Sequence, residues 1–263
     1  MSLKRVDQIL SSFFPDLSRS KIQSLIERKK IQFMNEVGDW VSFHKPGEKR
    51  DPSQFKAEGL RILADPELDF VSRGALKLKG AFDHWPHISA QGKTCLDIGL
   101  STGGFSDFLL QNGASRVLGI DAGSGQLHSK LKDHPKLDWY DKINARNSIP
   151  QTILDSFFGG HEPVFDCIVV DVSFISLSHF ARPIRSLLAP SGFCVALFKP
   201  QFEVGRGFLN KKGVVVDSQK VAQTLAGIQL VFNDNDLNVL ETVPSPIEGE
   251  NGNQEILLLI RHP

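Results

Sequence analysis

The sequence predicts a doubly wound α/β fold, a seven-stranded Rossmann-like sheet, preceded by a small α+β domain. From about residue 70, apolar runs of strand length alternate with helical periods, as in a parallel sheet covered by helices. The last two runs are joined by a loop too short for a crossover helix, so the last strand should be antiparallel. A chain of 263 residues has room for one large domain and a small module.

Seven short apolar runs are expected to form the strands of this sheet. They are residues 94–98, 117–120, 137–140, 167–171, 192–198, 237–242 and 255–260. The three cysteines, Cys95, Cys167 and Cys194, lie inside such runs and lack the spacing of metal ligands or disulfides. We therefore expect them in the hydrophobic core.

Before the sheet, two short amphipathic patterns separated by residues 15–17 predict a helical hairpin, with Ser18 as an N-cap. Residues 1–35 hold seven Lys and Arg against three Asp and Glu, although the whole chain has zero formal charge. A local basic patch can attract a phosphate backbone even in a neutral chain. We expect an RNA-binding domain over residues 1–60, a linker over 61–72 and a catalytic domain over 73–263.

Several classes of protein are disfavoured by what the sequence lacks. No stretch approaches the ~18 apolar residues that span a bilayer, and no secretory signal is recognisable, so a cytoplasmic location is expected. The eight histidines form no cluster with metal-ligand spacing, so we expect no metal.

A glycine-rich segment follows the first strand of the sheet, where open α/β sheets bind ligands. It runs from Asp97 to Phe105, and the next strand ends at Asp121, whose carboxylate can accept both hydroxyls of a ribose. The pattern is neither GxGxxG nor the phosphate-binding GxxxxGK[ST], which favours S-adenosylmethionine over a dinucleotide or a triphosphate. The alternative is that these glycines only shape a tight turn.

Many segments match one family. They include VSRGALKL, DIGLSTGGFSDFLL, GIDAGSGQL, INARN, DVSFISL, FKPQFE, KKGVVVD and GNQE. In these segments, and in RVDQIL and SRSKIQSLI near the start, the chain resembles the TlyA-type ribosomal RNA 2'-O-methyltransferases, relatives of the FtsJ group that are often labelled hemolysins. The resemblance implies S-adenosylmethionine as cofactor and methylation of cytidine ribose in 16S or 23S ribosomal RNA, or in both.

The resemblance also implies a catalytic tetrad of Lys77, Asp171, Lys199 and Glu255. Together with the glycine loop it predicts cofactor contacts from Asp97, Gly99, Ser101, Thr102, Gly103, Gly104, Phe105, Asp121, Gln126, Asn144 and Asp171. The N-terminal hairpin of this chain resembles an RNA-binding domain of a ribosomal small-subunit protein, which predicts RNA contacts from Arg5, Arg19, Lys21, Arg28, Lys29 and Lys30. Further RNA contacts are predicted in the catalytic domain, from Arg73 and Phe174.

The chemistry expected of the tetrad is alignment and proton removal. Two lysines at one site disfavour each other's charged form, so Lys199 is our candidate proton acceptor, with Asp171 and Glu255 orienting the lysines or facing the sulfonium. Phe174 either stacks on a base or on the cofactor, or lies in the core. Arg73 either contacts RNA or forms a linker salt bridge.

Three other functions compete with this interpretation. The first is a membrane-active toxin, but the apolar runs are too short to span a bilayer. The second is a noncatalytic assembly factor, which would not need the complete tetrad. The third is a methyltransferase for small molecules or proteins, which would leave the basic hairpin unexplained. The expected partner is ribosomal RNA or a ribosomal subunit, with the protein a monomer or a weak homodimer.

Overall fold

The computed structural model describes residues 2–146, 148–249 and 251–263. The chain divides into two compact units, residues 1–69 and 70–263. The expected linker over residues 61–72 differs from this division, because Leu60–Ile62 form a strand of the first unit and the Leu63 amide donates to the Lys30 carbonyl. The division after residue 69 lies within the expected linker, and the first residues of that linker belong to the first unit.

The first unit consists of a helical hairpin and two small sheets. Its helices and strands are α1 (Val6–Phe13), α2 (Arg19–Glu27), β1 (Lys4–Arg5), β2 (Ile31–Met34), β3 (Trp40–Ser42), β4 (Lys49–Arg50), β5 (Leu60–Ile62), η1 (Pro52–Gln54), η2 (Ala57–Gly59) and η3 (Pro66–Asp69). The strands pair antiparallel as β1–β4 and β3–β2–β5. Ser18 accepts a hydrogen bond from the Lys21 amide, which confirms the predicted N-cap of α2.

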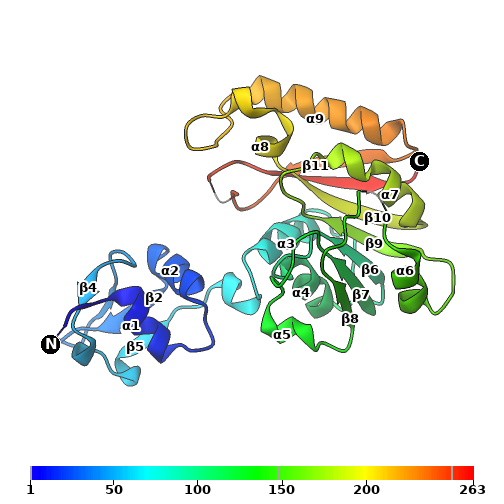
Figure 1. Cartoon of the computed structure of the whole chain (residues 1–263). Helices are drawn as coiled ribbons and strands as arrows, with labels where there is room; N and C mark the ends of the chain where they lie inside the picture. Colours follow the sequence, from blue (N-terminus) through cyan, green and yellow to red (C-terminus); the bar gives the residue numbers. More distant parts are fainter. Residues whose placement is uncertain (1, 147, 250) are drawn as a thin grey trace. The chain divides into compact units, whose positions relative to one another are not determined.

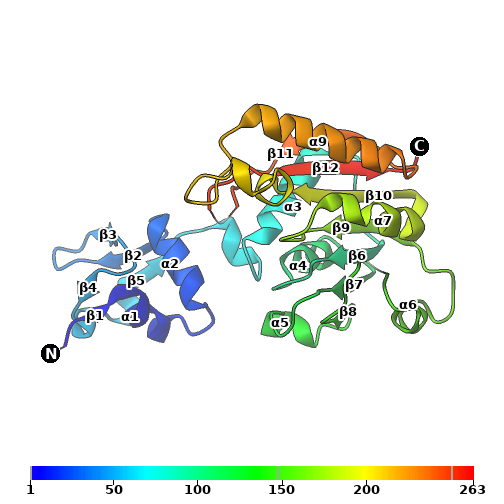
Figure 2. The same ribbon diagram turned by 45° about the horizontal axis from the view of Figure 1, so that its top comes forward.

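The second unit contains the predicted seven-stranded sheet. Its strands are β6 (Thr94–Ile98), β7 (Arg116–Ile120), β8 (Leu137–Tyr140), β9 (Phe165–Val170), β10 (Leu188–Phe198), β11 (Asn238–Pro244) and β12 (Ile256–Arg261). They follow the order β11-β12-β10-β9-β6-β7-β8, with β12 antiparallel to both neighbours and the pairs from β10 to β8 parallel. Figure 2 shows β12 between β10 and β11, which confirms the predicted antiparallel strand.

Helices cover both faces of this sheet (Figure 1). One face is covered by α6 (Gln151–Phe158), α7 (Ala181–Leu187) and α9 (Ser218–Asn233), and the other by α3 (Gly74–His84), α4 (Gly104–Gln111) and α5 (Ser129–Lys132). Three short helices lie in the connections: η4 (Leu177–Phe180), α8 (Pro200–Glu203) and η5 (Arg206–Phe208). This arrangement is the doubly wound fold that the alternating pattern predicts.

The core of the second unit has two apolar layers, one on each side of the sheet. All three cysteines are buried in these layers, as predicted. Within the described residues, no helix is both long and apolar enough to cross a membrane.

Candidate active site

The predicted cofactor loop connects β6 to α4 through a turn that glycine alone fits. Gly99 and Gly103 have φ angles of 92° and 90°, a region that residues with a side chain rarely adopt. A Cβ atom on Gly99 would collide with the carbonyl oxygen of Asp171, and one on Gly103 would collide with Leu131. Two neighbouring loops therefore approach each other backbone to backbone at the carboxyl edge of the sheet.

Asp121, at the end of β7, holds the loops of this edge together. Its two carboxylate oxygens accept hydrogen bonds from the amides of Ser101 at 2.7 Å and Gly123 at 2.6 Å. The Ser101 hydroxyl in turn donates to Gln126 at 3.0 Å. Because an ionised carboxylate has about four acceptor positions, Asp121 can still accept the two hydroxyls of a ribose.

Asp97 is a buried carboxylate with an incomplete set of partners. Its Oδ2 accepts from the Ser106 hydroxyl at 2.7 Å, whereas its buried Oδ1 has no hydrogen-bond partner among the described residues. Burial raises the pKa of Asp97 to about 7, the Ser106 hydrogen bond opposes that rise, and the charges of Asp171 and Asp121 add to it. An unpartnered buried oxygen with a raised pKa suits a ligand that brings a donor or a positive charge.

The remaining predicted cofactor residues do not all face one space. Phe105 is only 4% exposed and packs in the core against the sheet, so its side chain is not available to a cofactor. The helical periodicity of α4 directs this apolar ring toward the core. Thr102 and Asn144 are exposed, and the Asn144 side chain accepts a hydrogen bond from the Arg146 amide. Gly104 begins α4.

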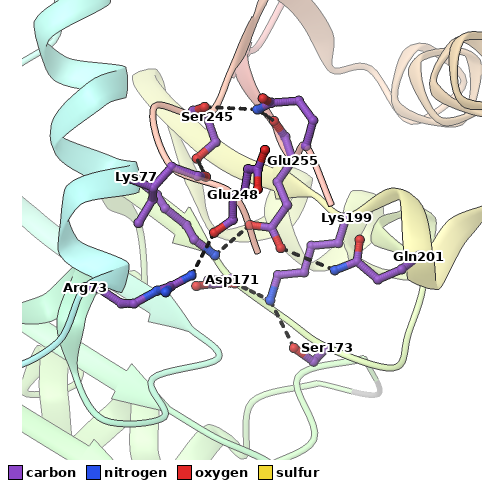
Figure 3. Close-up of polar contacts among 11 residues, drawn as sticks. Arg73, Lys77, Asp171, Ser173, Lys199, Gln201, Ser245, Glu248 and Glu255 are labelled. Carbon is purple, nitrogen blue, oxygen red and sulfur yellow. Dashed lines mark hydrogen bonds and ion pairs between the residues drawn. The ribbon is translucent and has the colours of Figure 1, made fainter. Parts of the chain in front are cut away.

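The four tetrad residues meet in two ion pairs (Figure 3). The Lys77 ammonium lies 2.6 Å from Glu255 Oε2, and the Lys199 ammonium lies 2.6 Å from Asp171 Oδ1. Lys77 is on α3, Asp171 and Lys199 follow β9 and β10, and Glu255 precedes β12. Lys77, Lys199 and Glu255 are less than 10% exposed, so these charges lie inside the protein beside the glycine loop.

This pairing changes one part of our hypothesis. We expected the two lysines to act mainly on each other, but each has its own carboxylate at 2.6 Å, which offsets repulsion between the ammonium groups. The Lys199 ammonium also donates to the Ser173 hydroxyl at 3.0 Å. In the described part of the chain, no group of His, Cys, Asp and Glu could hold a metal ion.

Two residues that support the tetrad, Ser173 and Gln201, were not predicted from the sequence. Ser173 contacts Lys199, and the Gln201 amide donates to Glu255 Oε1 at 3.3 Å. Both residues lie inside quoted motifs, DVSF and FKPQ, so the motifs could have pointed to them. Arg73 donates to the carbonyl of Glu248 at 2.8 Å and thus fastens the loop before β12, as Figure 3 shows.

Phe174 lies next to the tetrad and is not a core residue. Its side chain is 88% exposed, its φ angle is 63°, and its ring centroid lies 4.7 Å from that of Phe202. The loop that carries Phe174 is fixed by a hydrogen bond, which the Leu177 amide donates to Glu203 at 2.7 Å. Burial raises the pKa of Glu203, and hydrogen bonds from Ser176 and Leu177 oppose the shift. Of the interpretations of Phe174, the exposed ring fits base stacking.

Most of the basic residues predicted to bind RNA in the first unit form ion pairs or hydrogen bonds within that unit. Arg5 and Arg19 both bind the buried carboxylate of Asp7, at 3.0 and 3.1 Å. Arg28 binds Asp65 at 2.7 Å, and the Lys30 ammonium donates to the Ala64 carbonyl. Lys21 and Lys29 have exposed or half-exposed side chains. The arginines are therefore held in fixed positions with part of each side chain exposed.

Comparison with known proteins supports this description of the second unit. The family model of FtsJ-like methyltransferases matches residues 70–262. The chain is 37% identical over 202 residues to the 16S/23S rRNA (cytidine-2'-O)-methyltransferase TlyA of Mycobacterium tuberculosis, covering 77% of this chain and 72% of that protein. It is 34% identical to Hemolysin A of Brachyspira hyodysenteriae over 253 residues, covering 96% of this chain and 98% of that one.

A solved structure agrees along the whole chain. A protein described as a candidate hemolysin from Streptococcus thermophilus has 31% sequence identity and a TM-score of 0.72, covering 100% of this chain and 89% of that one. The sequence matches, the glycine loop and the paired tetrad thus point to one assignment. The chain belongs to the FtsJ-like methyltransferase family and, within it, to the TlyA and hemolysin A group.

Proposed function

We propose that this enzyme transfers a methyl group from S-adenosylmethionine to the ribose 2'-hydroxyl of a cytidine in 16S or 23S ribosomal RNA. The observation that carries the proposal is the pair of buried lysine–carboxylate contacts beside a glycine loop at the carboxyl edge of the sheet. The name and activity of the TlyA relative support the choice of RNA and of cytidine. Such a substrate would place the enzyme in the cytoplasm, where ribosomes are made.

The residues at the sheet edge fit the cofactor. Asp121 would accept hydrogen bonds from the ribose hydroxyls of the cofactor. The unpartnered oxygen of Asp97 would accept one from the cofactor's ammonium group. Gly99 and Gly103 would let the cofactor approach the backbone closely. When bound, S-adenosylmethionine supplies an activated methyl group and its own leaving group. The protein therefore has to provide alignment and a proton acceptor.

Lys199 is placed to receive the proton that the ribose hydroxyl loses. Its nitrogen lies between Asp171 and Ser173, at 2.6 and 3.0 Å, so its position is fixed on two sides. To act as the acceptor, Lys199 must first release its own proton to solvent; as an amine it would then take the hydroxyl proton, and Asp171 would stabilise the resulting ammonium. Lys77 and Glu255 form the second pair, which would orient the incoming ribose.

RNA would contact both units. Phe174 offers an exposed ring to an unstacked base, and Arg73 lies on the loop that leads to the tetrad. In the first unit, the basic residues would bind the phosphate backbone; they are Arg5, Arg19, Lys21, Arg28, Lys29 and Lys30.

The test is transfer of labelled methyl to ribosomal subunits from a strain that lacks this gene, followed by nuclease mapping of the product. Lys199→Ala should lower the rate at least about 100-fold, the typical contribution of a positioned acid or base. Lys79→Ala is the matched control, because Lys79 lies on α3 and pairs with Asp83 in an exposed contact away from the tetrad. A Lys199→Ala enzyme with wild-type rate, or a methyl group found on a base or a protein, contradicts the proposal.

A further inference from the structure

The connection between α8 and α9 contains a small basic hairpin, residues 205–216, outside the tetrad and the glycine loop. Leu209 pairs with Val215, and Asn210 closes the turn by accepting from the amides of Lys212 and Val214 at 2.8 and 3.0 Å. This turn presents Lys211 and Lys212 side by side at its tip, both exposed. The hairpin is thus a structured element rather than a loose loop.

The charge of the hairpin region is strongly positive. Residues 205–220 contain four basic side chains and one acidic side chain, Asp217. Asp217 caps α9 by accepting from the Lys220 amide at 2.8 Å. Among the described residues, none of the four cations forms an ion pair; they are Arg206, Lys211, Lys212 and Lys220. Unpaired cations on an exposed turn suit the phosphates of a nucleic acid.

An aromatic side chain lies among these cations. The Phe208 ring is 41% exposed, and the Lys220 ammonium lies 4.9 Å from its centroid. Basic groups interleaved with an exposed ring are the combination that binds single-stranded RNA, through phosphate contacts and stacking. A protein partner would more often require acidic or apolar complements in addition to the cations.

The hairpin is tied to the catalytic tetrad by one buried amide side chain. Asn253 is 2% exposed; its Oδ1 accepts from the Val215 amide at 2.9 Å, and its Nδ2 donates to the Gly213 carbonyl at 3.0 Å. Asn253 precedes Glu255 by two residues, a backbone distance of at most about 7 Å. Figure 1 shows the connection between α8 and α9 beside the loop that leads into β12. The hairpin is therefore hydrogen-bonded to the segment that leads to Glu255.

We propose that the hairpin of residues 205–216, with Lys220, binds the RNA backbone next to the target nucleotide, and that Asn253 is a positioning residue that keeps the hairpin in register with Glu255. This inference rests on the proposed function, because it specifies where the catalytic domain holds its RNA substrate. A ribose can reach the tetrad only if the neighbouring phosphates also lie on the protein surface, and these exposed cations belong to a hairpin that is hydrogen-bonded to Asn253 of that loop.

The first test compares the full-length double variant Lys211→Gln/Lys212→Gln with the wild type on naked ribosomal RNA and on ribosomal subunits. The KM for RNA should rise about five- to tenfold, with the cofactor Kd unchanged. Loss of two phosphate contacts should reduce the slope of log affinity against log salt by about 1.4. The matched control is Lys93→Gln/Lys136→Gln, two lysines directly before β6 and β8 and thus at the opposite edge of the sheet.

The second test is a double-mutant cycle with Asn253→Ala. If Asn253 acts through the hairpin, Asn253→Ala should also raise the RNA KM and lower the salt slope, and its effect should not add to that of the lysine variant. A purely structural role near Glu255 would lower kcat, leave the salt slope unchanged and be additive.

Three results have distinct meanings. Wild-type enzyme that labels no RNA contradicts the proposed function itself. Active wild-type enzyme with an unchanged RNA KM and salt slope in the lysine variant contradicts the hairpin proposal alone. An effect on subunits without any effect on naked RNA would also overturn it, since the hairpin would then contact a ribosomal protein.

Discussion

Asp7 and Asp97 are both fully buried carboxylates, one in each unit, and their surroundings differ. Asp7 accepts hydrogen bonds from Arg5, Arg19 and Gln23. Asp97 accepts from Ser106 only through one oxygen, and its other oxygen has no partner among the described residues. The first carboxylate is satisfied by the protein itself, whereas the second is left with an open acceptor at the predicted cofactor site.

The pKa values of the two carboxyl groups are consequently shifted in opposite directions. Burial alone would raise the pKa of Asp7, but the hydrogen bonds from Arg5, Gln23 and Arg19 outweigh it and hold that pKa well below its usual range. Burial raises the pKa of Asp97 to about 7, because one hydroxyl does not compensate for lost water. A buried carboxylate with all its donors stabilises the fold, and one with too few stabilises a cationic ligand instead.

The largest expected effect is on the satisfied carboxylate. Asp7→Asn leaves two guanidinium groups without their anion and should lower the free energy of unfolding of the first unit by about 2 kcal/mol, less than for a fully buried pair because both arginines are half-exposed. Hydrogen exchange of the α1 and α2 amides measures this. Asp16→Asn, at an exposed position between the helices, is the control. Equal exchange in both variants would show that the Asp7 network is not structural.

The next effect separates ligand binding from stability. Asp97→Asn keeps the shape but removes the negative charge, so the affinity for S-adenosylmethionine should fall about tenfold, equivalent to about 1.4 kcal/mol, while the protein becomes more stable at pH 8. Asp107→Asn is the matched control: both Asp107 oxygens already have donors, Val71 and Gln111. That variant should lose stability and keep its affinity. Calorimetric titration would contradict the assignment if Asp97→Asn bound cofactor as tightly as the wild type.

The pH dependence of the two carboxylates should have opposite signs. Between the unfolded pKa of 3.8 and about 7, folded Asp97 binds a proton that the unfolded chain lacks. Its contribution to stability therefore falls as pH rises, by at most about 1.4 kcal/mol per pH unit. Asp7 contributes stability above its unfolded pKa and loses it as pH falls below about 4.

Cofactor affinity measured from pH 5 to 8 is the corresponding binding experiment. Because a cationic ligand prefers ionised Asp97, affinity should rise toward pH 7 and then level off. In Asp97→Asn this rise should be absent. A rise that persists in the variant would assign the titration to another group.

The sequence predicted what is encoded locally. Apolar runs marked all seven strands of the large sheet to within a few residues, since a buried strand leaves a continuous apolar signal. The two- and three-residue strands of the first unit carry no such periodicity, which is why the last two residues of β5 were assigned to a linker. Phe105 was expected at the cofactor because it adjoins the glycine loop, yet the helical period points its side chain into the core.

The tetrad could not be derived from local pattern. Lys77 and Glu255 are 178 residues apart and meet only because the fold brings α3 next to the start of β12. Family resemblance suggested the four residues, but not which lysine would pair with which carboxylate. The distribution of donors between Asp7 and Asp97 was equally hidden, because both occur in similar apolar contexts, RVDQIL and KTCLDIG.

The smallest expected effect tests whether the Asp7 network is built from separable contacts. Gln23→Ala removes the donor 2.5 Å from Asp7 Oδ2 but leaves both arginines in place. The loss should be about 1 kcal/mol, the net value of one hydrogen bond. In the Asp7→Asn background the same substitution should cost less, because its acceptor is already weakened. If the two losses simply add, Gln23 stabilises α2 independently, and Asp7 is then held by the arginines alone.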